Sequence, residues 1–161
     1  MKLNYVTLFL ATSFLFSCKH TNYMTKAYSD IKKNVHEADV TLAKDTVKVV
    51  FPNSVLFDFG SATIKQDIYP AFQHFATELN KYRDVEILVC GHTDTVGNAD
   101  VNLSLSQRRA DSAKALLVQN KVDESRFYTW GMGAKHPIAS NSTEAGRQQN
   151  RRVEFVVLHK K

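Results

Sequence analysis

Residues 85–90 form a nearly continuous apolar run, and this run constrains the fold more than any other segment. Only Glu86 interrupts it. A strand of this kind is typical of a sheet that is covered on both faces. A polar stretch follows over residues 91–98, and a helical pattern follows over residues 101–119. The sequence therefore predicts a buried strand that leads through a loop into a helix.

Further strand signals lie on both sides of this unit. β-Branched residues in near-alternation, bounded by turn residues, are typical of strands. The expected strands are residues 38–42, 46–51, 55–59, 126–130 and 152–159, with a turn at 43–45 and a polar loop over 134–150. Because these strands alternate with helices, the chain is expected to form an α+β domain, in which helices pack on a mixed β-sheet.

A first helix is expected after Gly60. Thr63 and Gln66 match a capping box, and Pro70 falls within the first turn, where a missing N–H is tolerated. The apolar positions of this helix repeat at helical spacing and predict a core-facing stripe. The stripe consists of Ile68, Phe72, Phe75, Leu79 and Tyr82. In the second helix the expected inward positions are Leu103, Ala110, Ala113 and Leu117.

The N-terminal residues resemble a secretory signal. Lys2 is followed by the apolar run Val6–Phe16, which is shorter than the roughly 20 residues that a spanning helix needs. The run ends at Cys18 in a pattern that resembles the lipobox of bacterial lipoproteins. That resemblance implies cleavage before Cys18 and several acyl chains on it, which give firm anchoring. Lys19 is not the Asp that would favour the inner membrane.

We therefore expect a signal peptide over residues 1–17, a lipidated tether over 18–35 with some helix near its end, and one domain over 36–161. The net charge of +5 comes from scattered basic residues and gives little support for nucleic-acid binding. If Cys18 carries lipid, Cys90 has no second thiol in the chain with which to form a disulfide. Cys90 ends an apolar run and is expected to be buried and inert.

Asp94 and Arg109 are the most informative charged residues. Asp94 follows the expected buried strand, at a place where ligands bind in open sheets. Arg109 lies in the first half of the next helix, so the two side chains can meet at one mouth. Arg109 could clamp a carboxylate while Asp94 receives an ammonium group, as a zwitterion requires. From the spacing alone, a structural Asp94–Arg109 ion pair is the simpler interpretation.

The same two residues belong to a longer ordered pattern. It begins at residues 55–62 and ends at residues 146–153. Its central residues are Gly91, His92, Thr93, Asp94, Gly97, Asn102, Leu105, Ser106, Arg109 and Ala110, followed by Gly131, Gly133 and residues 137–141. Over about residues 45–159 this pattern resembles the OmpA C-terminal domain family, which includes Pal lipoproteins and the MotB periplasmic domain.

The resemblance implies a mixed sheet of βαβαββ type that binds peptidoglycan non-covalently, through peptides that contain meso-diaminopimelate. Asp94 and Arg109 are then expected to contact the amphoteric end of diaminopimelate. Asn102 and Leu105 match positions that line the same groove, and the segment of Phe57 and Asp58 borders it. The implied function is that of an outer-membrane lipoprotein whose periplasmic domain links the membrane to the wall. The alternative is a Pal-like component of a periplasmic protein complex, with wall binding secondary.

Other polar residues point less clearly to a function. Cys90, His92 and Asp94 include three metal-ligand types, but no fourth ligand is near and they need not converge, so no metal is expected. His92 is expected to order the loop by hydrogen bonds. Arg147, Asn150, Arg151 and Arg152 are expected to be structural and solvent-exposed, although contact with glycan or partners stays open.

An enzyme is the least favoured class. Ser104 and Ser106 lie outside any Gly-x-Ser-x-Gly elbow. Asp58 and Asp94 could form a glycosidase pair, but Asp94 is already assigned to a ligand ammonium. Gly131 and Gly133 lack the third glycine of a dinucleotide-binding motif. We therefore expect no catalysis and no cofactor.

Overall fold

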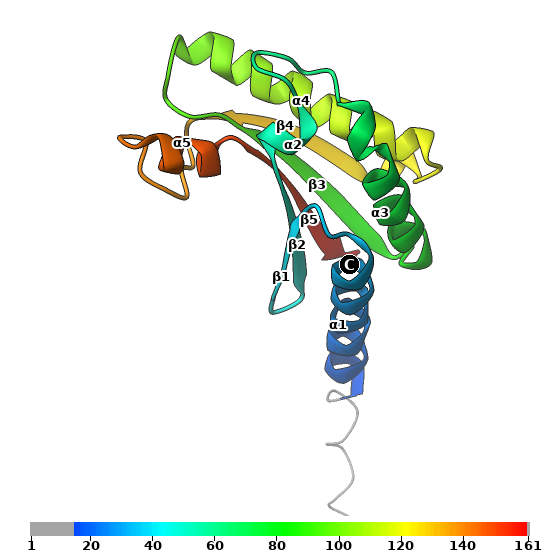
Figure 1. Cartoon of the computed structure of the whole chain (residues 1–161). Coiled ribbons are helices and arrows are strands. Elements are labelled where there is room, and N and C mark those ends of the chain that lie inside the picture. Colours follow the sequence, from blue (N-terminus) through cyan, green and yellow to red (C-terminus); the bar gives the residue numbers. More distant parts are fainter. Residues whose placement is uncertain (1–14, 161) are drawn as a thin grey trace, which may run out of the picture.

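A five-stranded mixed sheet carries the helices of the domain (Figure 1). The computed structural model describes residues 15–160, with side chains from Tyr23 onward. The strands are β1 (Asp39–Ala43), β2 (Thr46–Pro52), β3 (Val85–His92), β4 (Phe127–Gly133) and β5 (Arg152–His159). Their order is β1-β2-β5-β3-β4, with β3 and β4 parallel and the other pairs antiparallel. The expected α+β class is confirmed.

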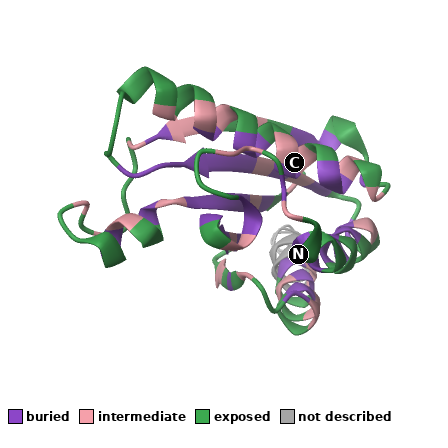
Figure 2. Cartoon of the chain, turned by 45° about the horizontal axis from the view of Figure 1, so that its top comes forward, coloured by how far each residue is buried: buried purple, intermediate pink, exposed green. Residues whose placement is uncertain are grey.

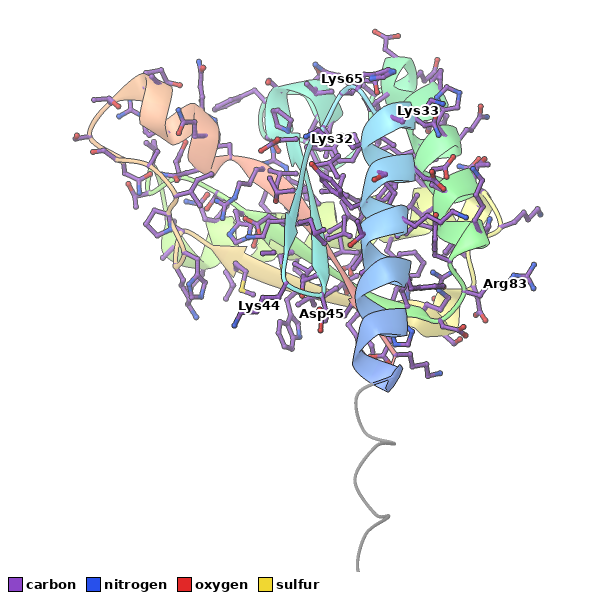
Figure 3. The ribbon with its side chains drawn as sticks, turned by 90° about the horizontal axis from the view of Figure 1, so that it is seen from below. Lys32, Lys33, Lys44, Asp45, Lys65 and Arg83 are labelled. Carbon is purple, nitrogen blue, oxygen red and sulfur yellow. The ribbon has the colours of Figure 1, made fainter. Side chains whose placement is uncertain are left out.

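The helices follow the expected connections, and the short helices α2 and α5 are additions to them. They are α1 (Leu15–Asn34), α2 (Asn53–Leu56), α3 (Tyr69–Lys81), α4 (Ala99–Gln119) and α5 (Glu144–Asn150), with 3-10 turns η1 (Gln66–Ile68) and η2 (Glu124–Arg126). From β2 onward the order β2-α3-β3-α4-β4-β5 is the βαβαββ arrangement, with α5 inserted in the expected polar loop. In Figure 3, Lys44 and Asp45 mark the tip of the β1–β2 hairpin, which has the expected turn.

The core lies between one face of the sheet and the helices (Figure 2). Phe51 and Phe155 of the sheet contact Phe72 and Phe75 of α3, with ring centroids 5.2–6.3 Å apart. The whole predicted stripe of α3 is buried, which confirms it as a core face. Such ring clusters bury large apolar areas and dominate the stability of a small domain.

Three of the four inward positions predicted for α4 are buried, and Leu103 is not. The first turns of α4 lie against Gly131 and Gly133, where a Cβ on either glycine would meet the backbone of Leu103 or Gln107. The helix therefore approaches β4 through its backbone, and Leu103 stays 39% exposed. A close glycine contact replaces the expected side-chain packing.

The strand expected over residues 55–59 is wrong. The chain forms the short helix α2 instead, closed by a 2.8 Å hydrogen bond from the N–H of Phe57 to the carbonyl of Asn53. Pro52 has no N–H to continue a ladder, and the chain turns over the end of the sheet there. The capping box is also absent, because η1 follows Thr63 and α3 begins only at Tyr69, with Pro70 near its start as expected.

β3 is covered by helices on one face only, in contrast to the expectation. Ile87 and Val89 are buried on the helix side, whereas Leu88 on the other face is only partly buried. Leu88 lies between Val156 of β5 and Tyr128 of β4, so neighbouring strands cover it from the sides. Lateral contacts of this kind explain an apolar run without a second layer.

The described part of the segment expected as a tether forms α1 and packs on the domain, across the boundary expected at residue 36. Its buried residues are Met24, Ala27, Ile31 and Val35. Their spacing is helical, and polar contacts add to it: Tyr82 donates to Asp30 over 2.6 Å, and Asn34 donates to Glu78 over 2.8 Å. The expected signal segment lies largely outside the described residues, as does the side chain of Cys18. Within residues 15–160, no helix is both long and apolar enough to span a bilayer.

The packing of α1 predicts a stability effect. Replacing Ile31, which is 1% exposed, by alanine should lower the free energy of unfolding by about 2 kcal/mol or more, because a cavity opens between α1 and the sheet. Urea denaturation of the chain without its first 17 residues measures this. Lys33→Ala on the exposed side of α1 is the control and should change little. Equal stability of both variants would mean that α1 behaves as a detached tether.

Candidate ligand-binding site

A cavity of about 630 Å³ opens at the C-terminal end of β3. All six residues that the sequence singled out line it: Phe57, Asp58, Asp94, Asn102, Leu105 and Arg109. Three further charged residues come from α5 and its end, Glu144, Arg147 and Arg151. They reach the cavity because β5 runs antiparallel to β3 and Arg152 pairs with His92, which brings Arg151 beside Asp94.

The loop that carries Asp94 is held by side-chain hydrogen bonds. Oδ1 of Asp94 accepts from the N–H of Val96 over 2.9 Å. Nδ2 of Asn102 donates to the carbonyl of Val96 over 2.9 Å, and Asn98 caps α4 by accepting from two N–H groups. Asn102 therefore borders the cavity, as expected, while its amide orders the loop. Asp94 itself is 7% exposed.

Arg109 is a buried cation at the base of the cavity. It is 3% exposed, its Nε donates to the carbonyl of Ser61 over 2.8 Å, and its Cζ lies 5.1 Å from the ring centroid of Phe57. Within the described residues, no hydrogen bond or ion pair engages its two terminal nitrogens. Burial, and then the neighbouring Arg108 and Arg151, lower the pKa of Arg109 to about 10. Asp94 acts in the opposite direction through space, but no ion pair engages Arg109 within the described residues. Arg109 thus stays protonated at neutral pH without an ion-pair partner there, which favours an anionic ligand group.

Asp94 does not pair with Arg109 in the structure. Oδ2 of Asp94 accepts from Nη1 of Arg151 instead, and Nη2 of Arg151 donates to Glu144. The hydrogen bond to Glu144, opposed by burial, raises the pKa of Arg151. The simple Asp94–Arg109 ion pair that the spacing left open is therefore wrong, and Arg151 is a cavity residue that the sequence interpretation placed among exposed structural residues.

Two other residues of that exposed group are in fact buried. Asn150 is 0% exposed and accepts hydrogen bonds from the N–H groups of Ile138 and Ala139. Arg152 is 3% exposed and pairs with Glu154 over 2.7 Å. Both are structural as expected but not solvent-exposed, because the preceding loop packs on them: Arg152 donates to the carbonyl of His136, and Asn150 donates to the carbonyl of Ala139. They hold the loop beside the cavity.

His92 does not order the loop by hydrogen bonds. It is 4% exposed, and neither ring nitrogen has a hydrogen-bond partner in the described part of the chain. Burial, followed by the positive charge of Arg152, lowers the pKa of His92 to about 4, with Glu154 acting in the opposite direction. Cys90 is buried as expected, and burial raises the pKa of its thiol to about 11. Among residues 23–160, no cluster of three metal-ligating side chains is present.

The buried His92 predicts a pH-dependent stability. In the unfolded chain the pKa of His92 returns toward 6.5. Between about pH 4 and 6.5 the His92 side chain is therefore protonated in the unfolded state and neutral in the folded state. Stability from this residue is complete above that window and should fall by up to about 1.4 kcal/mol per pH unit as pH drops through it. Urea denaturation at several pH values measures the slope. His92→Leu should flatten it and exposed His74→Leu should not, whereas an unchanged slope in His92→Leu would contradict this assignment.

Comparisons with known proteins agree with this arrangement. The family model described as the OmpA family matches residues 56–151, which is more than half of the chain and includes the cavity wall except Asn53 and Ser54. The chain belongs to the OmpA family. It is 43% identical over 118 residues to the probable lipoprotein YiaD of Escherichia coli strain K12, covering 73% of this chain and 54% of YiaD. The chain thus spans about half the length of that relative.

Two solved structures share the fold at similar identity. The cell wall anchor of the T6SS from Pseudomonas aeruginosa is 30% identical, with a TM-score of 0.72, covering 85% of this chain and 97% of that one. The peptidoglycan-associated lipoprotein from Burkholderia pseudomallei is 31% identical, with a TM-score of 0.59, covering 64% and 87%. This chain is therefore a relative of proteins of the bacterial envelope, and its OmpA-like fold is shown.

Proposed function

We propose that this chain is an outer-membrane lipoprotein that binds peptidoglycan non-covalently and links the membrane to the wall. The observation that carries the proposal is Arg109, a buried guanidinium whose terminal nitrogens have no partner within the described residues and lie at the cavity with Asp94. A guanidinium fork matches a carboxylate, and an adjacent carboxylate matches an ammonium group. The amphoteric end of meso-diaminopimelate carries both, so the cavity suits this end of a wall peptide.

The arrangement of the domain supports the same proposal. Helix α5 lies at the opposite end of the molecule from α1, and so does the N-terminal half of α4 (Figure 1). A lipid on Cys18 would then hold the membrane end, while the cavity faces away from it toward the periplasm. Two similar proteins are named as lipoproteins, YiaD and the Burkholderia pseudomallei protein, and the second is named as peptidoglycan-associated. No catalytic step is proposed, because the cavity acids are engaged with basic residues.

Co-sedimentation with isolated sacculi tests the wall-binding part. The chain should pellet with sacculi that contain diaminopimelate and bind less to lysine-type wall, which lacks the amphoteric third residue. Asp94→Asn should weaken binding while keeping the far-UV circular dichroism transition. Release of soluble muropeptides during the incubation would overturn the non-catalytic assignment, and equal binding to both wall types would remove the role given to Arg109.

Fractionation of cells tests the anchor separately. Cys18→Ala should move the protein out of the outer-membrane fraction and leave binding of the purified domain to sacculi unchanged. The two parts of the proposal can therefore fail independently. A protein that stays in the membrane fraction without Cys18 would contradict lipid anchoring but not wall binding.

A further inference from the structure

The carboxylate of Asp94 is already engaged at both oxygens. Oδ1 accepts from the N–H of Val96, and Oδ2 accepts from Nη1 of Arg151. An ammonium group that approaches Asp94 therefore meets a guanidinium on the same carboxylate. Two cations that share one buried acid repel each other strongly where water is excluded. The cavity as described is not yet arranged to receive an ammonium.

The acids and the bases of the cavity differ in whether they are already paired. Each acid has a basic partner within the described residues: Asp58 with Lys65, Asp94 with Arg151, and Glu144 with both Arg147 and Arg151. Among the basic residues of the wall, Arg109 is the one without an ion pair in that part of the chain. A ligand carboxylate can therefore bind without rearrangement, whereas a ligand ammonium either shares Asp94 with Arg151, whose charge repels it, or displaces Arg151.

Glu144 gives Arg151 an alternative position. Nη2 of Arg151 already donates to Glu144, whose side chain is 56% exposed, and the Arg151 side chain is 28% exposed at the mouth. Arg151 can leave Asp94 and still keep a charged hydrogen bond. We propose that Arg151 is a specificity-determining residue that holds the place of the ligand ammonium on Asp94, and that a zwitterionic ligand displaces it while Glu144 retains it. This inference rests on the proposed function and deepens it.

A difference in ligand selectivity follows. Binding of a carboxylate depends on Arg109, and binding of the neighbouring ammonium depends on how readily Arg151 is exchanged. Loss of Arg151 leaves Asp94 buried without its partner, a state that an ammonium relieves. Loss of Glu144 leaves Arg151 with Asp94 as its remaining acidic partner, so displacement becomes harder. The two changes should therefore act in opposite directions.

Calorimetric titration of the full chain with two ligands tests this inference. The probes are meso-diaminopimelate and pimelate, which has the same carbon skeleton and both carboxylates but no ammonium group. In Arg151→Gln the affinity for diaminopimelate should rise roughly tenfold while the affinity for pimelate does not rise. In Glu144→Gln the preference for diaminopimelate over pimelate should fall several-fold. Arg83→Gln, on the surface away from the cavity (Figure 3), is the control and should leave both affinities unchanged.

Thermal unfolding supplies an independent measurement. Without ligand, Arg151→Gln should melt below the wild type, and diaminopimelate should raise its melting temperature more than it raises that of the wild type. If Arg151→Gln does not fold, the result for Glu144→Gln decides. A reduced preference for diaminopimelate over pimelate supports the displacement of Arg151 from Asp94 by the ligand, and an unchanged preference overturns it. Binding of both ligands with the same preference in every variant overturns the role of Arg151 alone. A wild-type chain that binds neither ligand overturns the proposed function itself.

Discussion

Replacing Arg109 by glutamine should reduce wall binding more than any other single change at the cavity. The guanidinium is the one cation of the cavity wall without an ion pair in the described residues, so a ligand carboxylate loses its charged partner entirely. Loss of a charged hydrogen bond costs about 1.5–3 kcal/mol, or roughly 10- to 150-fold in affinity. Titration with diaminopimelate and co-sedimentation with sacculi should both report this loss.

A binding role and a structural role for Arg109 differ in their effect on stability. Among the residues that the structure describes, Arg109 is a buried cation with a single hydrogen bond, from Nε to the carbonyl of Ser61. A neutral side chain removes the cost of burying that charge, so Arg109→Gln should melt close to the wild type or above it. A variant that melts far below the wild type but binds sacculi normally would make Arg109 a structural residue.

The neighbouring Arg108 provides a matched control. It is exposed on the same helix, and its Nη1 donates to Ser104 over 2.6 Å, away from the cavity wall. Arg108→Gln removes the same charge from α4 without removing a cavity residue, so binding should change by less than about twofold, as is usual for an exposed charge. A parallel loss in both variants would mean that the general positive charge of α4 drives binding.

The sequence predicted the elements with strong periodicity and missed those that depend on contacts distant in the chain. The stripe of α3, the run of β3 and the alternation of β5 each carry their signal within one segment, so these elements are correctly predicted. α1 has an equally regular apolar spacing, but Ala27 is small and most residues between the buried positions are polar or charged. The packing of α1 against α3 and the sheet was therefore not apparent from composition.

The cavity shows the same division. Asp94 and Arg109 flank one strand–loop–helix unit, so their approach to a common mouth follows from local connectivity. Arg151 lies 57 residues after Asp94, and its contact with it depends on the antiparallel register of β3 and β5, in which His92 lies opposite Arg152. No periodicity within one segment encodes that register. The short helix α5, which supplies Glu144, was not predicted, because its seven residues are mostly polar and show no apolar periodicity.

The position of Gly91 links the fold to the cavity. A Cβ built on Gly91 would collide with the backbone carbonyl of Ser106 in α4. The hydroxyl of Ser106 in turn donates to the carbonyl of Leu103 over 2.7 Å and accepts from the N–H of Gly133 over 2.9 Å. α4 therefore lies on β3 and β4 at a distance that only glycine permits. This distance places Arg109, three residues after Ser106, beside the loop of Asp94.

Gly91→Ala should accordingly destabilise the chain by about 3 kcal/mol or more, because the clash involves backbone on both sides and no side-chain rotation relieves it. In a strand without such a contact, the same change would be neutral or slightly stabilising. Gly60→Ala is the control: its φ of +70° is strained for alanine, but no atom lies within 4 Å of the new Cβ, so about 1 kcal/mol is expected. Urea denaturation compares the two variants. Equal losses would show that α4 can move away from β3 at little cost, and the distance between Arg109 and the loop of Asp94 would then not be fixed by this contact.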